Sequence, residues 1–314
     1  MKMNVFMLST ILLCASCSED ENIIKKEDPM KPDTEISTGD NSETNNVPSE
    51  NRFSVNSTVA EVISDPAFGN FGYLLFPIDR YILRSMTLAD ISSSSVYVWY
   101  SHIQPEKTVE IINRLYSDAI AGNQIFYRIY SDAEIAADPS KADTGLFLFR
   151  GETGKPFAIT NAGGGFLYVG AMHDSFPHSL EISESGYNAF ALIYRPDDPY
   201  VDLARAIEFI HDNAAGLGVK ADDYSLWGGS AGARMAAVLG NKIYLQQLTD
   251  RTDIPQASSV IMQYTGYTQH QNMMLRLMYA LALMTASLIG ELCRTVCNVC
   301  LKWVYPRSSM CMMV

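Results

Sequence analysis

The sequence predicts an α/β fold with a mostly parallel sheet and helices on both faces. From about residue 155 onward, short apolar runs alternate with amphipathic helical patterns, and glycine-rich turns separate the two. The chain of 314 residues, 47% of them hydrophobic, is long enough to bury a core of this kind. Strands that alternate with helices normally form a parallel sheet, whose functional residues lie at the carboxyl ends of the strands.

The charge and motif content exclude several classes of function. The net charge is −12 and the sequence pI is about 4.8, which argues against nucleic acid because phosphates are neutralised by clustered Lys and Arg. The chain has no P-loop, dinucleotide glycine fingerprint or HExxH helix. We therefore expect no cofactor, no metal ion and no nucleic acid partner.

The first 17 residues have the pattern of an export signal. Lys2 is followed by an apolar run from Val5 to Leu13, which is too short to span a bilayer, and small residues then lead to Cys17. This pattern resembles the lipobox of bacterial lipoproteins, in which the chain is cut before the cysteine and a lipid is attached to its sulfur. We expect residues 1–17 to be a lipoprotein signal peptide and Cys17 the lipidation site; the alternative is a plain signal peptide cut nearby.

Residues 18–52 form a polar, acidic stretch with almost nothing to bury, so we expect a disordered linker. Its first residues, Ser18 to Glu21, resemble the tag that sends some lipoproteins to the outer cell surface. The expected location is therefore the bacterial outer membrane, with the folded part tethered by lipid at the cell surface.

Residues 53–145 are predicted to form an N-terminal elaboration together with the first antiparallel strands of a mixed sheet. Helical spacing of apolar residues predicts a helix between Pro105 and Ala121. Runs rich in β-branched and aromatic residues predict strands at Phe71–Phe76, Val96–Tyr100, Ile125–Tyr130 and Leu146–Phe149.

Residues 146–270 are predicted to form the α/β core. The expected strands are Phe157–Asn161, Tyr187–Tyr194, a short strand beginning at Tyr224, and Ser258–Tyr264. An amphipathic helix is expected over Val201–Ala215, ended by the glycines at 216 and 218.

The chemistry of this core is expected at Ser230. The strand beginning at Tyr224 runs into Gly228-Gly229-Ser230-Ala231-Gly232, a Gly-x-Ser-x-Gly turn that is followed by a helix of small residues. This is the pattern of a nucleophile elbow, in which a strained turn holds a serine hydroxyl clear of the sheet. The alternative is an ordinary strand–glycine–helix junction with an exposed serine.

A glycine triplet, Gly163–Gly165, follows the strand at Phe157–Asn161. Three glycines let backbone N–H groups point into a site with no Cβ in the way, as an oxyanion hole requires. We therefore expect Gly164, Gly165 and Ala231 to supply the donors, Ala231 being the residue after the predicted nucleophile. A glycine triplet by itself is more often a flexible loop.

Together these motifs resemble the α/β-hydrolase superfamily over about residues 145–268, most closely its acetylxylan and feruloyl esterase-like branch. The resemblance rests on Asn161 to Phe166, on the strand and helix that follow, and on the turn at Ser230. It implies Ser230 as the catalytic nucleophile of a carboxylesterase-type serine hydrolase. The implied substrate is an ester, either a small molecule or an acyl group on a polysaccharide. Ala162 departs from the pattern, because many members have a histidine there.

The acid and histidine that such a serine needs should follow it in the chain. After Ser230 the only histidine is His270, and the only carboxylates are Asp250, Asp253 and Glu291. Asp250 and Asp253 precede the last predicted strand and so lie at the wrong end of the sheet. His173, Asp174 and His178 are closer in sequence to the glycine triplet, but surface positions or positions on the helix after this loop are expected for them.

Residues 271–314 have a foreign composition. Four of the six cysteines, Cys293, Cys297, Cys300 and Cys311, fall there, in a spacing that matches no common zinc site. The segment from Met273 to Leu292 is apolar enough to be a candidate membrane helix, although Arg276 counts against it.

A third interpretation is that this tail is translated one nucleotide out of register. The genetic code then fixes several residues of the original frame. In that frame, the codons of Met273 and Met274 together contain an Asp codon, and those of Trp303 and Val304 contain a Gly codon. With degenerate bases chosen freely, residues 272–286 decode as a strand ending in an Asp-Gly turn, where the hydrolase acid belongs. We therefore hypothesise a frameshift between about Thr268 and Asn272, which removes the acid, the histidine and the last strands and leaves this chain impaired. The alternative function is a non-catalytic, lipid-anchored binding protein that keeps the fold.

Overall fold

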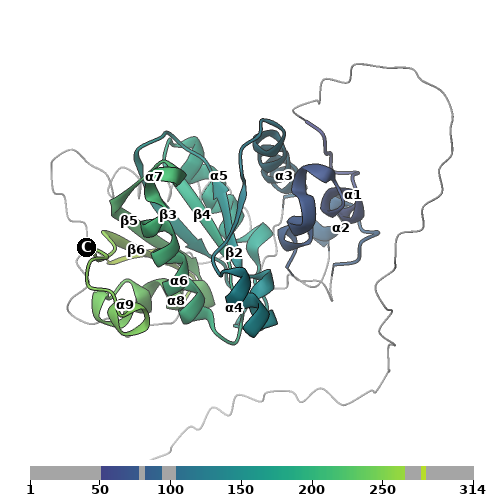
Figure 1. Cartoon of the computed structure of the whole chain (residues 1–314). Coiled ribbons are helices and arrows are strands. Elements are labelled where there is room, and N and C mark those ends of the chain that lie inside the picture. Colours follow the sequence, from purple (N-terminus) through teal and green to yellow (C-terminus); the bar gives the residue numbers. More distant parts are fainter. Residues whose placement is uncertain (1–50, 78–81, 94–103, 266–276, 281–314) are drawn as a thin grey trace, which may run out of the picture. The chain divides into compact units, whose positions relative to one another are not determined.

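The computed structural model describes residues 51–77, 82–93, 104–265 and 277–280, all within one compact unit, Asn46–Val314 (Figure 1). The predicted signal peptide with Cys17, most of the acidic linker and the predicted strand at Val96–Tyr100 lie outside the described residues. The same holds for the tail, apart from residues 277–280.

The described part of the chain begins with helices. They are α1 (Val59–Ile63), the 3-10 helix η1 (Pro66–Leu75), α2 (Leu88–Ser93) and α3 (Pro105–Ile120). Helix α1 begins at a capping box, in which Thr58 and Glu61 each accept a backbone N–H of the other. Helix α3 begins with a proline and buries one face, as its apolar spacing predicts.

The prediction of a strand at Phe71–Phe76 is wrong, because this run belongs to η1. The Asp65 side chain accepts the N–H of Ala67 and Pro66 occupies the first helical turn, so the segment starts as a helix. Gly69 has a φ of +52° and kinks it. Of the side chains that suggested a strand, Leu74, Leu75 and Phe76 are buried, whereas Tyr73 is 44% exposed.

One seven-stranded sheet forms the centre, in the order β1-β2-β4-β3-β5-β6-β7. Its strands are β1 (Phe126–Arg128), β2 (Gly145–Phe149), β3 (Lys155–Asn161), β4 (Asn188–Ile193), β5 (Val219–Gly229), β6 (Ser259–Gln263) and β7 (Leu277–Ala280). The pairs β1–β2 and β2–β4 are antiparallel, and all the other pairs are parallel. The strands predicted near residues 125–130, 146–149, 157–161, 187–194 and 258–264 are thus present.

Helices cover both faces of this sheet. The remaining helical segments are α4 (Asp132–Ala137), η3 (Pro139–Asp143), η4 (Ala171–His173), α5 (Ser175–Glu184), α6 (Pro199–Asp212), α7 (Ala214–Leu217), α8 (Ala231–Leu239) and α9 (Lys242–Thr249). On β3, the Thr160 hydroxyl hydrogen-bonds Ser179 of α5, whereas the Phe157 ring contacts His211 of α6. Residues three apart in a strand point to opposite faces, so α5 and α6 lie on opposite sides (Figure 1). The predicted fold class is confirmed.

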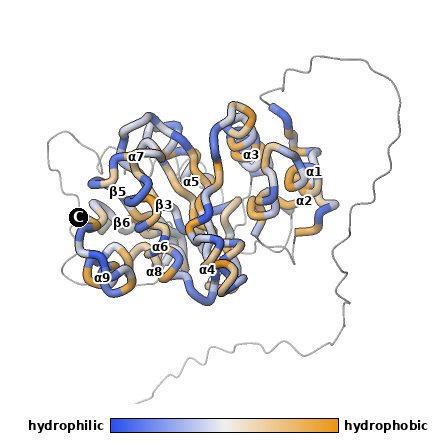
Figure 2. The backbone as a smooth tube through the Cα atoms, viewed as in Figure 1, coloured by the Kyte–Doolittle hydropathy of each residue, from blue (hydrophilic) through white to orange (hydrophobic). Residues whose placement is uncertain are grey.

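The strands of the sheet are mostly buried, as expected for a sheet covered on both faces, although β5 has polar residues near its start and is continuously buried only from Tyr224 onward. Every residue of β2, β4 and β6 is buried, and the hydrophobic segments in Figure 2 are concentrated around β3 and α5. The N-terminal helices join this core through aromatic contacts, since the ring of Phe71 stacks on Phe126 of β1 at a centroid distance of 5.1 Å.

The position next to β6 at the edge of the sheet is occupied by β7, which pairs in parallel from Val260↔Leu277 to Gln263↔Ala280. We expected the strands at this end of the sheet to be missing or replaced. The strand that lies beside β6 is indeed formed by residues of the 271–314 segment. Within the described ranges, no helix has the length and apolar character needed to cross a membrane. The rest of the membrane-helix candidate, Met273–Leu292, is outside those ranges.

Candidate active site

Ser230 lies at the sharp turn where β5 ends and α8 begins. Its φ and ψ are 48° and −111°, a left-handed combination that costs a non-glycine residue free energy. The side chain is partly exposed, whereas the strand before it is buried. The turn therefore lifts the hydroxyl-bearing residue clear of the sheet, as the sequence pattern predicts.

The two glycines of the Gly-x-Ser-x-Gly pattern are required by close backbone approach. A Cβ on Gly228 would overlap the backbone of Gly232, because the first turn of α8 passes directly over the end of β5. A Cβ on Gly232 would overlap the carbonyl oxygen of Asn161, at the end of the neighbouring strand β3. Any larger residue at either position would force the helix away from the sheet.

The backbone of the turn is fixed to the next strand. The Ser230 N–H donates to the carbonyl oxygen of Gln263, the last residue of β6, at 3.0 Å. Within the described residues, the Ser230 hydroxyl makes no hydrogen bond with a side chain. The strained backbone is therefore held from both sides while the hydroxyl stays available.

The glycine triplet lies against this turn. A Cβ built on Gly163 would lie only 3.1 Å from the Cβ of Ser230, so the loop and the serine are direct neighbours. Gly164, Gly165 and Phe166 have φ values of 145°, 63° and 58°, which curl the loop tightly. The structure thus brings together two motifs that lie about 65 residues apart in the sequence.

The amides of this loop divide into two groups. Gly163 donates its N–H to the carboxylate of Asp174 at 2.5 Å. The N–H groups of Gly164, Gly165 and Ala231 donate to no acceptor in the described part of the chain. The three predicted oxyanion donors are therefore uncommitted, but their role stays a prediction.

Sequence reasoning missed Asp174 as part of this site. Its carboxylate is 3% exposed, and its Oδ2 accepts both the Gly163 N–H and the hydroxyl of Tyr264, each at 2.5 Å. The Tyr264 hydroxyl lies where a Cβ on Gly229 would be, so it covers the backbone next to Ser230. Asp174 thereby connects the glycine loop, the start of α5 and the end of β6.

Two further side chains brace the ends of the strands. Asn161 donates its amide N–H to the carbonyl oxygen of Trp227 at 2.9 Å, which ties the end of β3 to β5. The buried hydroxyl of Tyr194 donates to the carbonyl oxygen of Ala162 at 2.8 Å, at the start of the glycine loop. Asn161 thus helps to hold the backbone next to Ala162, the position at which many members of the family that this chain resembles have a histidine.

None of the described histidines is hydrogen-bonded to Ser230. His178 lies on α5, where its Nδ1 is 2.6 Å from the carbonyl oxygen of Asp174, and His173 hydrogen-bonds Thr108 of α3. His211 contacts the ring of Tyr224, six residues before Ser230 in β5, so it is about 20 Å away along the strand. His173 and His178 are thus placed as expected, beside and on the helix after the loop, and His211 lies far from the site.

The carboxylates after Ser230 are also accounted for. Asp253 forms an exposed ion pair with Arg251 at 2.6 Å, and Asp250 ends α9 in a left-handed conformation. Both precede β6, away from the carboxyl ends of the parallel strands. His270 and Glu291 lie outside the described residues.

A buried ion pair at the end of β4 is a second feature that the sequence did not reveal. Asp202 is fully buried, and its carboxylate accepts from the guanidinium of Arg195 at 2.7 Å and from the hydroxyl of Tyr130 at 2.6 Å. The hydrogen bonds to Asp202 raise the pKa of Arg195. Burial, followed by the hydrogen bond to Asp202, raises the pKa of Tyr130. This group fixes the loop between β4 and α6 beside the site.

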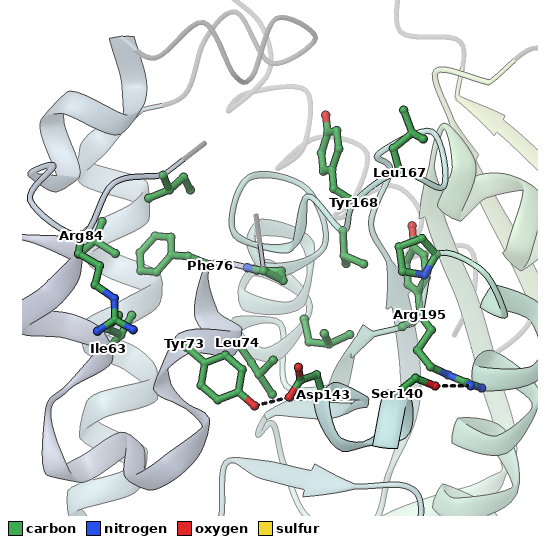
Figure 3. A pocket seen from close by; sticks show the side chains of 17 residues that line it. Ile63, Tyr73, Leu74, Phe76, Arg84, Ser140, Asp143, Leu167, Tyr168 and Arg195 are labelled. Atoms are coloured by element: carbon green, nitrogen blue, oxygen red, sulfur yellow. Dashed lines mark hydrogen bonds between the residues drawn. The ribbon is translucent and has the colours of Figure 1, made fainter. Parts of the chain in front are cut away.

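A cavity of about 420 Å³ opens between the N-terminal helices and the glycine loop (Figure 3). Its walls come from η1, η3, the residues that follow the glycine triplet and the end of β4. They are Val59, Ile63, Tyr73, Leu74, Phe76, Pro77, Ile82, Arg84, Ser140, Asp143, Leu167, Tyr168, Val169, Ile193, Tyr194, Arg195 and Pro196. Ser230 is not among them. The cavity therefore adjoins the loop and does not enclose the serine.

The described residues contain no group of three or more His, Cys, Asp or Glu side chains that could hold a metal ion. A strained serine between a strand and a helix, beside a glycine loop that follows β3, is the arrangement of the α/β-hydrolase fold. The fold predicted from the two motifs is therefore present.

No family model and no curated protein matches this chain. Among solved structures, MGS-M1, an α/β-hydrolase enzyme from a Medee basin deep-sea metagenome library, is 22% identical over 41% of this chain and 55% of its own, with a TM-score of 0.34. Esterase 2 of Thermogutta terrifontis phosphorylated by paraoxon is 20% identical over 46% and 59%, with a TM-score of 0.36. Esterase B of Lactobacillus rhamnosis is 22% identical over 45% and 47%, also with a TM-score of 0.36. The match thus spans about half the length of these enzymes.

Proposed function

We propose that this chain is a serine hydrolase of the carboxylesterase type, with Ser230 as its nucleophile. The observation that carries the proposal is the left-handed backbone of Ser230, held next to a loop with uncommitted amides. Such strain is costly and persists where the surrounding structure imposes it, most often at functional sites.

In the proposed reaction the Ser230 oxygen attacks the carbonyl carbon of an ester. The negative charge that develops on the carbonyl oxygen is stabilised by the N–H groups of Gly164, Gly165 and Ala231, and each lost donor would slow the reaction by about 10²–10³-fold. The alcohol leaves with a proton, and water then releases the acid from the acyl-enzyme. A base must take the proton of the hydroxyl, and no described histidine is hydrogen-bonded to Ser230. We therefore propose that this chain has impaired activity.

A fluorophosphonate probe tests the nucleophile directly, because it forms a covalent bond with an activated serine. We expect labelling of the full chain that is lost in Ser230→Ala and retained in Ser185→Ala, a serine at the exposed end of α5. Labelling that persists in Ser230→Ala would refute the assignment. No labelling of the parent chain would favour the non-catalytic binding protein.

The proposed substrates are esters, including acyl groups on polysaccharides. The likeness of residues 161–166 and of the turn at Ser230 to the acetylxylan and feruloyl esterase-like branch supports this choice. Release of acetate from acetylated xylan, compared between the parent chain and Ser230→Ala, measures it. A rate equal to that of the variant would count against polysaccharide esters.

The impairment has a proposed origin in the gene. A frameshift between about Thr268 and Asn272 would replace the segment that carries the acid and the histidine. Sequencing the gene and translating the neighbouring frame tests this, and restoring that frame should raise esterase activity. A neighbouring frame without a histidine after a glycine turn would contradict the hypothesis.

We also propose that the chain is exported and held at the outer membrane by a lipid on Cys17. The small residues before Cys17 and the acidic run after it support this location. Full-length protein should partition into the detergent phase of Triton X-114, and Cys17→Ser should move it to the aqueous phase. Cys311→Ser, far from this segment in the sequence, is the matched control and should leave the partitioning unchanged. Detergent partitioning of Cys17→Ser would favour a membrane helix instead.

A further inference from the structure

We propose that the cavity beside the glycine loop binds the apolar part of the ester, an uncharged group about the size of one or two rings. This inference rests on the proposed function, because it places a substrate group next to the Ser230 site. Its volume of about 420 Å³ falls in the range of small-molecule sites. The cavity is lined mainly by aliphatic and aromatic side chains, which provide the binding free energy for such a group.

The position of the cavity connects it to the reaction. Leu167, Tyr168 and Val169 form one wall and begin two positions after the glycine triplet. The Leu167 N–H donates to the carbonyl oxygen of Gly164 at 3.0 Å, so this wall and the predicted oxyanion donors belong to one tightly turned loop. A group held against this wall therefore lies against the same loop that carries the predicted donors Gly164 and Gly165.

The charged groups of the lining are either paired within the protein or exposed at the edge of the cavity. Arg195 is paired with the buried Asp202 and also donates to Ser140 (Figure 3). Asp143 is exposed and accepts the hydroxyl of Tyr73, and burial, together with this bond, raises the pKa of Tyr73 to about 12. Arg84 is exposed at the edge of the cavity beside Ile63 (Figure 3). A charged ligand in the interior would lose hydration and could reach only Arg84 at the exposed edge, so the interior favours an uncharged group.

Exposed apolar side chains mark the same place. Leu167 is 75% exposed and Tyr73 is 44% exposed, although both are large and both line the cavity. Water contact at such side chains is unfavourable, so covering them with a ligand would add to affinity. The two residues come from segments almost a hundred positions apart, which indicates a shared surface and not a local feature of one loop.

The cavity can be tested without any turnover. The full chain carrying Ser230→Ala is titrated with 6-propionyl-2-(dimethylamino)naphthalene, an uncharged dye whose emission shifts to the blue in apolar surroundings. We expect saturable binding that weakens by at least about tenfold when Ile63→Trp fills the cavity. Leu167→Ala should weaken binding by about threefold or more, because it removes part of an exposed wall.

Leu248→Ala is the matched control, because Leu248 is a 45% exposed leucine on α9 that does not line the cavity. Its binding should equal that of the parent. If Ile63→Trp does not fold, Leu167→Ala still tests the proposal, because the Leu167 side chain is mostly exposed and its removal should not disturb the fold. Dye binding that is unchanged in the cavity variants, or equally weakened in Leu248→Ala, would overturn the proposal.

A second measurement ties the cavity to the ester. Labelling of Ser230 by a phosphonate with a benzyl group is compared with labelling by one with a methyl group. In the parent the benzyl compound should react faster, and Ile63→Trp should reduce this ratio by at least about fivefold while sparing the methyl compound. A ratio that Ile63→Trp leaves unchanged would overturn the proposal even if the dye binds. If neither phosphonate labels the parent, the proposed function fails, and the dye titration still decides whether the cavity binds an apolar group.

Discussion

Removing the carboxylate of Asp174 should both destabilise the fold and disturb the Ser230 turn. In Asp174→Ala the N–H of Gly163 is left without its acceptor in a buried position, which costs about 1–3 kcal/mol. The hydroxyl of Tyr264 loses the same acceptor, but it is only partly buried and can reach water, which adds about 1 kcal/mol. The free energy of unfolding should therefore fall by about 2–4 kcal/mol in total.

Urea unfolding of the full chain, followed by circular dichroism, measures this loss. Two tyrosine variants separate the contributions, because Tyr264→Phe removes one of the two hydrogen bonds and should cost about 1–2 kcal/mol. Tyr73→Phe is its control: that tyrosine also donates to an aspartate, Asp143, but at the surface, and its removal should cost less than about 0.5 kcal/mol.

The same variants should differ in the rate at which a phosphonate labels Ser230. Asp174→Ala releases the start of the glycine loop, which is in contact with the serine, so labelling should slow by about tenfold or more. Labelling in Ser185→Ala, at the exposed end of α5, should match the parent. If Asp174→Ala unfolds within about 0.5 kcal/mol of the parent and labels at the parent rate, the connecting role that we assign to this carboxylate is wrong.

Three further predictions use the unfolding assay. A Cβ at Gly232 would overlap the last carbonyl oxygen of β3, so Gly232→Ala should strongly lower the free energy of unfolding. Gly216→Ala, in open space on α7, is the control and should raise it by about 0.5–1 kcal/mol. Similar effects of the two substitutions would contradict the packing argument. Burial of its ring nitrogens lowers the pKa of His173 from 6.5 to about 3, so the unfolded chain binds more protons over this range. Stability should therefore fall as pH drops from about 6.5 toward 3, and less steeply in His173→Gln. Asp202→Ala should cost about 3–5 kcal/mol, because it removes the buried carboxylate that accepts from both Arg195 and the Tyr130 hydroxyl. Asp198→Ala, which removes an exposed partner of the same arginine, should cost less than about 1 kcal/mol, and equal losses would refute the distinction.

The sequence was informative wherever a local requirement decides the residue. The turn at Ser230 needs glycines at 228 and 232 because backbone approaches backbone there, and this requirement leaves a pattern that can be recognised in five residues. The alternation of buried strands with amphipathic helices likewise predicted the parallel part of the sheet, from β3 to β6. In both cases neighbouring residues determine the structure.

Features that depend on distant residues left no such signal. Asp174 and Tyr264 lie 90 positions apart, and nothing near either residue indicates that they meet at Gly163. The segment at Phe71–Phe76 has the composition of a strand, but the cap at Asp65 and the kink at Gly69 make it a 3-10 helix with no neighbouring strand. The cavity could not be predicted either, because its walls come from segments that only the folded chain brings together.

The described contacts that shape the serine turn all come from residues 161–264, whereas a base for the hydroxyl would have to be supplied from elsewhere. Under the proposed function, the bent backbone and the proton acceptor of the catalyst would thus be encoded in separate stretches of the chain. Mutation could then alter the acceptor and leave the bend intact, so turnover could be lost or regained without any change in the serine turn. The rate at which such a chain reacts with an electrophilic inhibitor would depend on how well its remaining bases activate the serine hydroxyl. This rate would therefore measure how much of the catalytic base the chain retains.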